Sequence, residues 1–458
     1  MEADSSMAAA ARQLRARLAP DRLLVPGPAY DEARRLWNGA VDHRPALIVR
    51  ARTPAQVREA VLAARDHHLH VSVRGGGHDW AGRAVRPGGL VIDLTGMRQI
   101  AVDAKARTAT VGGGATAREV IAAAAPHGLV AATGACGAVG MAGLTLTGGY
   151  GPLSGRFGLA VDNLLGAGVV LADGRLVTAD AAHEPELFWA LRGGGGNFGV
   201  VTSIRIRLHP VRRLLAGFIM FPWAQAAGVW EGLRAVRADA PDELTVQSGI
   251  LTGPDGSLLA FLSPAWSGDP APGEKAIEKL LRIGRPLLSQ VAPRTYAQML
   301  CLFDASVVDG RCYAIGTRSV TDFTPDVIAA ILRAGSTLTS PLSLMSIHHF
   351  HGAAARIHPD ATAFGIRQDH LTFEIVAAWE PDDRHGARHR AWAQSLSTIL
   401  APHALPGGYP GLLGPDNHDQ IAHAYGHNDA RLRAAKARFD PHGIFTATAL
   451  PPTEKVPA

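Results

Sequence analysis

The sequence predicts an α+β protein built from two parts. Its 458 residues exceed the size at which a single hydrophobic core stops growing, which is about 250–300 residues. Three glycine-rich loops lie in the first half, at 75–77, 133–158 and 193–196. From about residue 211 onwards glycine clusters become rare, and strand patterns alternate with long helical ones. These observations predict a ligand-binding part followed by an antiparallel sheet that helices cover on one side.

Helices and strands alternate through the first half. Residues 1–46 are expected to be helical, up to a strand at Leu47–Arg50. Thr53-Pro54 begins a helix that runs to about His67, because proline is favoured in the first turn. A strand at His70–Arg74 then leads into a glycine loop and completes a β-α-β unit. The remaining expected elements are strands at 90–94, 108–112 and 200–208, a helix capped by Thr116 and Glu119, a hairpin at 168–178 turned by Asp173-Gly174, and a helix at 185–191.

The second half contains the strands of the expected antiparallel sheet. They are expected at Glu243–Leu251, Leu258–Leu262, Arg311–Arg318, Leu342–Phe350 and Leu371–Trp379. Long helical patterns separate them. The tail at 422–452 is first polar and then apolar.

The composition is that of a soluble globular protein. Hydrophobic residues make up 47% and charged residues 19% of the chain, which excludes a disordered protein. The net charge of +5 comes without a basic run interleaved with aromatic residues, so we expect no nucleic-acid partner. Three cysteines are too few for a disulfide framework. The chain opens with acids and arginines where a signal peptide is apolar, and it has no long apolar stretch. We therefore expect a cytoplasmic monomer or homodimer that does not bind a membrane.

The strongest chemical signal is the segment RGGGHDWAG at Arg74–Gly82. A dinucleotide-binding loop opens directly into a helix, whereas this loop meets His78, Asp79 and Trp80. A lone histidine is more often structural than functional. Here, however, His78 ends a glycine loop, which can present its ring to a planar ligand lying against the backbone.

Several segments in order resemble one flavoprotein family. They are RGGGHDWAG, GLAVDNLLGAGVVLADG at 158–174, LFWALRGGGGNFGVVTSI at 187–204 and the tail YGHNDARLRAAKARFDPHGIF at 425–445. They are similar to the FAD domain of the vanillyl-alcohol-oxidase/p-cresol-methylhydroxylase (PCMH) flavoproteins, and within them to the bacterial branch of the berberine-bridge-enzyme-like family. The resemblance implies a two-part, PCMH-type FAD-binding domain at 1–210, a substrate domain at 211–404, and a C-terminal segment at 405–458 that returns to the FAD domain.

The resemblance also implies how FAD is held. The imidazole of His78 would attack the flavin 8α carbon, and Cys136 would form a second bond at flavin C6. Gly137 stands where the family usually has proline, and a buried, inert thiol is the alternative for Cys136. The backbone of the loops at 75–77 and 148–151 would meet the pyrophosphate. The full set of implied cofactor-binding residues is Arg74, Gly75, Gly76, Gly77, His78, Gly134, Cys136, Val139, Gly140, Gly143, Gly148, Gly149, Tyr150, Gly151, Val200, Tyr425 and Asn428.

Two residues are candidates for the catalytic base. Glu374 lies in the apolar strand LTFEIVAAW, where burial would raise the pKa of its carboxyl and suit it to accept a proton. A surface or paired glutamate is the alternative, because exposed faces of antiparallel sheets are polar. Tyr409, in GGYPG, resembles the tyrosine of a family motif whose asparagine is replaced here by Gly411.

The substrate pocket is expected to include Trp80, Ser346, His348 and Phe350. The run His348, His349 and His351 invites a metal interpretation, but neighbouring residues of a strand face opposite ways. We therefore expect no metal site.

The implied activity is that of an FAD-linked oxidase of small, specialised metabolites. Hydride would pass from the substrate to flavin N5, and dioxygen would accept the electrons and form H2O2. A dehydrogenase or monooxygenase on the same scaffold, and a flavin-binding protein without turnover, are the alternatives. A base such as Glu374 beside the flavin favours an enzyme, since a carrier needs none.

Overall fold

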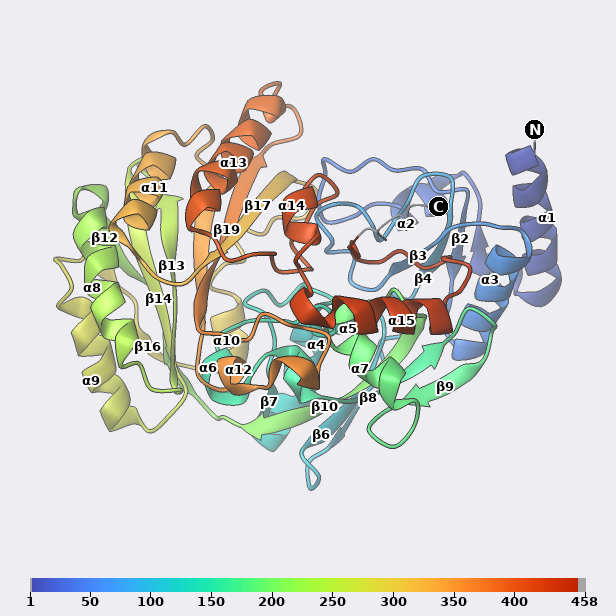
Figure 1. Cartoon of the computed structure of the whole chain (residues 1–458), viewed down its shortest axis with the longest axis horizontal. Helices are drawn as coiled ribbons and strands as arrows, with labels where there is room; N and C mark the ends of the chain where they lie inside the picture. Colours follow the sequence, from blue (N-terminus) through green and yellow to red (C-terminus); the bar gives the residue numbers. More distant parts are fainter. Residues whose placement is uncertain (1, 452–458) are drawn as a thin grey trace.

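The glycine-rich half begins with a small sheet at one end of the molecule (Figure 1). The computed structural model describes residues 2–451. Residue 1 of the predicted FAD-binding domain and residues 452–458 of the predicted C-terminal segment lie outside the described residues. The sheet has the order β1 (Leu23–Leu24), β2 (Leu47–Arg50), β4 (Leu90–Asp93) and β3 (Val71–Arg74), the last three being parallel. Helices α1 (Glu2–Arg17) and α3 (Pro54–Asp66) pack on it. The loop at 75–77 follows β3, at the carboxyl edge where parallel sheets bind ligands.

A second, six-stranded sheet carries the other glycine loops. Its strands are β5 (Ile100–Asp103), β6 (Thr108–Gly112), β10 (Val200–Pro210), β8 (Leu164–Val170) and β9 (Leu176–Ala179), with β7 (Leu129–Ala131) paired to β10. Side chains along β10 alternate as predicted, because Ile204 and Ile206 are buried while Arg205 and Arg207 are exposed. Helices α4 (Ala117–Ala124), α5 (Met141–Leu146), α6 (Ser154–Phe157) and α7 (Pro185–Gly194) lie around it.

A nine-stranded sheet forms the other half of the molecule (Figure 1). Its main path is β15 (Leu288–Ser289), β12 (Ile219–Pro222), β14 (Leu258–Trp266), β13 (Leu244–Thr252), β18 (Leu344–Phe350), β19 (His370–Trp379) and β17 (Cys312–Val320), with β11 (Leu214–Ala216) and β16 (Ala292–Arg294) at its side. All of these pairings are antiparallel. Helices α8 (Ala226–Ala238), α9 (Pro270–Leu281), α11 (Pro325–Ser336) and α13 (Gly386–Leu400) cover one face. The predicted α+β class with a helix-covered antiparallel sheet is confirmed.

The end of the chain returns to the glycine-rich half. Helix α15 (Asp429–Phe439) runs beside α7 (Figure 1). Within this helix, Lys436 donates to the backbone oxygens of Asn197 and Phe445; beyond the helix, Phe445 forms a β-bridge with Val71. Short helices α10 (Tyr296–Leu300), α12 (Ala353–Arg356) and α14 (His418–Ile421) complete the chain. The division at residues 210 and 404 stays a prediction.

The structure corrects the expectation for the first 46 residues. They are helical only in α1 and in α2 (Pro28–Ala33), apart from one short turn, and residues 34–46 form a loop. Several prolines and glycines interrupt the segment, because proline cannot continue a helix and glycine destabilises one; they are Pro20, Pro26, Gly27, Gly39 and Pro45.

Candidate active site

A cavity of about 400 Å³ lies between the glycine loops and the face of the nine-stranded sheet that its helices leave uncovered. Segments far apart in the sequence form its walls. They include Gly75, Gly76, Gly77, His78, Trp80, Gly134, Cys136, Val139, Gly140, Gly143 and Tyr150 from the glycine-rich half, Ser346, His348, Glu374 and Val376 from the sheet, and Tyr409 and Thr446–Thr448 from the C-terminal part. The cavity therefore brings together most of the predicted cofactor, base and substrate residues.

The two glycine loops at the cavity touch backbone to backbone. A Cβ on Gly76 would lie 2.4 Å from the nitrogen of Gly140, and a Cβ on Gly140 would lie 2.5 Å from that of Gly76. Only glycine permits this approach. In the described part of the chain, the N–H groups of Gly75, Gly76 and Gly77 donate no hydrogen bond. They are available to anionic oxygens such as those of a phosphate.

His78 is a neutral imidazole at the cavity wall. Its ring stacks on Trp37, with ring centroids 4.2 Å apart and 14° between the planes. Burial lowers the pKa of His78 to about 4, because the charged ring would lose its hydration. Its Nε2 is buried and has no hydrogen-bond partner among residues 2–451. At neutral pH His78 is thus uncharged, the form in which an imidazole acts as a nucleophile.

Glu374 projects from β19 and is held by two neighbours. The Tyr150 hydroxyl donates to its Oε2 at 3.1 Å, and Nε2 of His348 lies 3.3 Å from the same atom. Glu374 and Ser346 are paired across β18 and β19, and both line the cavity. Oε1 of Glu374 accepts no hydrogen bond within the described residues and is not buried, so it is open to a substrate proton.

The direction of the Glu374 pKa shift was predicted wrongly. Burial does raise the pKa, and it is the largest single cause. The hydrogen bond and charge of His348, with the hydrogen bond from Tyr150, more than offset it, so that the pKa lies below its usual value. Glu374 is therefore a carboxylate at neutral pH and ready to accept a proton.

Tyr409 also faces the cavity, but it is poorly suited to be a base. Its hydroxyl oxygen accepts a hydrogen bond from the backbone N–H of Gly149 at 2.6 Å. Burial raises the pKa of Tyr409 to about 12, so the phenol keeps its proton at neutral pH. Of the two predicted candidates, Glu374 is the one that fits the role.

The chain is similar to known flavoenzymes over nearly its whole length. A family model described as an FAD binding domain matches residues 45–180. (R)-6-Hydroxynicotine oxidase of Paenarthrobacter nicotinovorans is 36% identical over 437 residues, which are 91% of this chain and 93% of that protein. The crystal structure of 6-hydroxy-D-nicotine oxidase from Arthrobacter nicotinovorans matches with a TM-score of 0.86 at 28% identity, covering 93% of this chain and 96% of that one. BBE-like 1 of Physcomitrella patens, at 24% identity, shares the fold with a TM-score of 0.85, covering 96% of this chain and 99% of that one.

The chain belongs to the berberine-bridge-enzyme-like FAD-linked oxidoreductases. It is an enzyme of the oxidoreductase class, and the resemblance read from its glycine loops is confirmed. Two observations show that the cavity fits FAD. The glycine loops at Gly76 and Gly140 leave no room for a Cβ, and Nε2 of His78 is buried without a hydrogen-bond partner among the described residues.

Cys136 and Val139 of this BBE-like oxidoreductase lie on the same loop at the cavity. Cys136 is a free, half-buried thiol, and burial raises its pKa. The thiol form therefore dominates at neutral pH, which makes Cys136 a weaker nucleophile than a thiolate would be. Val139 is also half-buried and lies next to Gly140, at the contact between the two glycine loops.

Some predicted residues of the BBE-like site lie outside the cavity walls. The loop at 148–151 is not free to meet a pyrophosphate, because the N–H of Gly149 bonds to Tyr409 and that of Gly151 bonds to Ser154 at 2.8 Å. A Cβ on Gly148 would lie 2.8 Å from the Tyr409 ring, so glycine there makes room for tyrosine. The predicted residues that do not line the cavity are Arg74, Gly148, Gly149, Gly151, Val200, Phe350, Tyr425 and Asn428.

These residues have structural roles instead. Arg74 bonds to the backbone oxygen of Ala33, and Asn428 donates to the backbone oxygens of Pro359 and Thr362. Val200 is fully buried beside β8, and Tyr425 is fully buried beside Thr448. Phe350 packs behind the cavity, against Tyr150 and Tyr409.

Other wall residues were missed by sequence reasoning. They include Trp37, Gln247, Phe303, Tyr313, Ile315 and Thr446–Thr448. Trp37 and Tyr313 lie on a loop and a strand that carry no recognisable motif. The alternation of side chains along β17 could have predicted that Tyr313 and Ile315 lie in one wall, because they face the same side of the strand.

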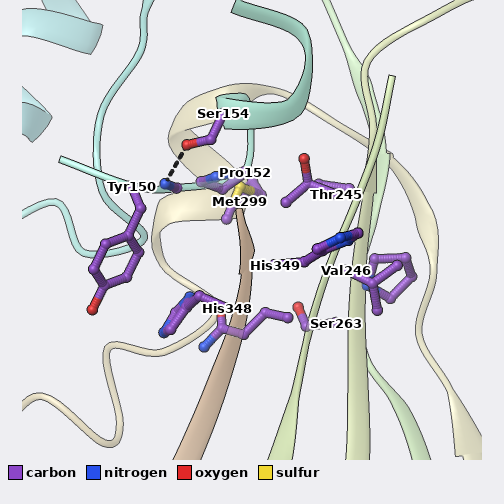
Figure 2. Close-up of a pocket in the computed structure, with 13 residues that line it drawn as sticks. Tyr150, Pro152, Ser154, Thr245, Val246, Ser263, Met299, His348 and His349 are labelled. Carbon is purple, nitrogen blue, oxygen red and sulfur yellow. Dashed lines mark hydrogen bonds between the residues drawn. The ribbon is translucent and has the colours of Figure 1, made fainter. Parts of the chain in front are cut away.

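A small pocket adjoins the cavity at Tyr150 and His348, which line both (Figure 2). Its volume is about 20 Å³, enough for about one water molecule. The Thr245 hydroxyl is buried there without a partner among residues 2–451. His349 also lines this pocket, but its Nε2 lies 3.2 Å from Asp369 whereas Nε2 of His348 lies 3.3 Å from Glu374, so the two rings have different partners.

Two features of the described residues concern metals and membranes. Within residues 2–451, no three His, Cys, Asp or Glu side chains gather where they could hold a metal ion. Among the same residues, every helix is too short or too polar to cross a bilayer.

Proposed function

We propose that this oxidoreductase holds FAD covalently, through His78 and also through Cys136, and that it oxidises a small organic substrate with dioxygen as the electron acceptor and H2O2 as a product. One observation carries the proposal: a single cavity joins a glycine cradle and a neutral His78 to the carboxylate of Glu374. FAD, when bound, would supply the hydride acceptor and pass the electron pair to dioxygen.

The bond through His78 would join a ring nitrogen to the flavin 8α carbon. One hydrogen leaves the imidazole and one leaves the 8α methyl group, and dioxygen takes the electron pair to give H2O2. The bond through Cys136 would join its Sγ to flavin C6 with the same balance, one hydrogen leaving the thiol and one leaving C6. The high pKa of Cys136 makes this second bond the slower of the two.

Glu374 would take the proton from the hydroxyl or amine of the substrate. Oε2 stays fixed by Tyr150 and His348, and Oε1 faces the cavity. A base held in this way needs no rearrangement when the substrate binds, which is the condition for efficient proton transfer.

The substrate body is proposed to be apolar and largely aromatic. Rings of Trp80, Tyr150, Tyr313 and Phe303 contribute to the walls, and the lining exposes more apolar than polar surface. Such walls suit a planar, neutral molecule. Asp79 and Arg83, which also line the cavity, are paired with each other and offer the substrate no free charge.

A substrate screen tests the proposed function. The purified protein is mixed in air with 6-hydroxynicotine, benzylic alcohols, phenolic compounds and oligosaccharides, and H2O2 formation is followed with a peroxidase dye. We expect H2O2 from at least one aromatic compound. A dehydrogenase would give a different result: substrate would bleach the flavin quickly without air, but air would reoxidise the flavin only over minutes.

Replacing Val139 by Leu tests how dioxygen reaches the flavin. The longer side chain would fill space on the loop between Cys136 and the glycine contact at Gly140. We expect reoxidation of the reduced flavin by aerated buffer to slow severalfold, while reduction by substrate changes little. Stopped-flow absorbance at the flavin maximum measures both rates, and equal slowing of the two would contradict a gas-access role.

His348→Leu tests the electrostatic control of Glu374. The pKa of Glu374 is depressed chiefly by His348, so its carboxylate form persists to low pH and is lost only as the pH falls through that depressed pKa. Without His348 the pKa should rise, and the acid limb of anaerobic flavin reduction should move to higher pH. His403→Leu, at an exposed site, serves as the control. An unmoved acid limb would mean that Glu374 is not the titrating base.

A further inference from the structure

Three aromatic rings form a continuous stack that begins at His78. Trp37 covers one face of His78, and its own other face lies on Tyr313 with centroids 4.0 Å apart and 16° between the planes. His78 belongs to a glycine loop, Trp37 to the loop at 34–46, and Tyr313 to β17 of the nine-stranded sheet. The stack thus ties the His78 ring to both halves of the molecule.

Asn38 and the backbone hold the middle of the stack in place. The backbone N–H of Trp37 donates to the backbone oxygen of Gly77, the residue before His78, at 3.1 Å. Asn38, only 2% exposed, accepts from the N–H of Tyr313 at 2.8 Å and donates to the backbone oxygen of Trp80 at 2.7 Å. These contacts use the backbone of Trp37 and the neighbouring amide, so a change of the Trp37 ring leaves them intact.

The stack is the contact from another residue that holds the plane of the His78 ring. The torsion next to an imidazole has a broad, shallow energy profile. Nε2 of His78 has no hydrogen-bond partner in residues 2–451 that could select one orientation. The ring has a hydrogen bond to its own backbone, and packing against Trp37 is the orienting contact that another residue supplies.

We propose that Trp37 is a positioning residue for flavin attachment, which rests on the covalent bond proposed for His78. A neutral imidazole attacks along its nitrogen lone pair, which lies in the ring plane. Tilting the ring moves that lone pair off the 8α carbon. A misplacement of about 1 Å can slow a reaction by about 100-fold. Trp37 therefore sets how fast FAD becomes attached, and not whether FAD binds.

The test follows the attachment itself. Protein is produced in flavin-limited cells, mixed with FAD, and quenched in acid at intervals; acid-stable flavin absorbance and intact mass report the bond. We expect Trp37→Leu to slow attachment by about 10- to 100-fold while binding FAD noncovalently. Trp37→Phe, which keeps a ring in the stack, should restore most of the rate. Trp223→Leu, at a tryptophan outside the cavity walls, should attach FAD at the normal rate.

A second variant keeps the proposal testable if Trp37→Leu is unstable by thermal melting. Tyr313→Leu leaves Trp37 in place but removes the ring behind it, and should also slow attachment. Tyr313→Phe keeps that ring and loses only the hydroxyl contacts to residues 306 and 308, so it should attach FAD normally. If both leucine variants attach FAD at the normal rate, the proposed role of Trp37 is wrong, while the covalent bond through His78 is unaffected. A wild-type protein with no acid-stable flavin would overturn the covalent bond as well.

Discussion

Glu374→Gln is expected to slow the reduction of the flavin by substrate about 100-fold or more, the usual contribution of a general base. The amide keeps the shape of the side chain and can still pair with Tyr150 and His348, but it cannot take a proton. Anaerobic stopped-flow measurement of flavin bleaching gives the rate, with a substrate found in the screen. Substrate affinity, read from the concentration dependence of that rate, should change little.

Glu380→Gln is the matched control for this variant. Glu380 directly follows β19, is half-exposed, and pairs with Arg311 at 2.9 Å. Its replacement should leave the reduction rate unchanged. If Glu374→Gln reduced its flavin as quickly as the wild type, the proton would have to leave to the substrate itself or to solvent, and the assignment of the base would be wrong.

The second large effect is expected in the attachment of FAD. The wild-type protein should stay yellow after acid precipitation, with an intact mass that exceeds the chain by one FAD. His78→Ala should keep acid-stable flavin through Cys136, formed slowly because burial raises the pKa of that thiol. Only the double variant of His78 and Cys136 should release all of its flavin into the acid supernatant.

Cys301→Ala provides the control, since Cys301 is an exposed thiol outside the cavity walls. It should retain all acid-stable flavin. Loss of all acid-stable flavin from His78→Ala alone would show that Cys136 is a packed thiol and that His78 makes the sole bond. Full retention by the double variant would place the attachment on another residue.

The parts of the site that sequence reasoning found are those with a local cause. The loop at 75–77 needs glycine because a neighbouring backbone passes close to it, and a side chain would block that approach. Glu374 stood out because a single carboxylate interrupts an apolar strand. The same local logic gave the helix start at Thr53, whose side chain accepts from the N–H of Gln56.

The errors arose where the cause lies far away in the sequence. Gly149 seemed free to bind phosphate, yet its N–H is taken by Tyr409, whose position only the fold determines. The pKa of Glu374 moves down and not up because His348 and Tyr150 reach it from other segments. Trp37 carries no motif, and its stacking on His78 depends on a loop that was expected to be helical.

The composition of the cavity wall also constrains the order of events during biosynthesis. Trp37 comes from the start of the chain, whereas Thr446–Thr448 come from its last described residues. Domains generally fold from the N-terminal end as the ribosome delivers them. Here the glycine loops can form early, but the wall beside them closes only once residue 448 has emerged. If FAD is attached as proposed, we therefore expect its stable loading to follow translation, and nascent chains stalled before that point should not acquire acid-stable flavin.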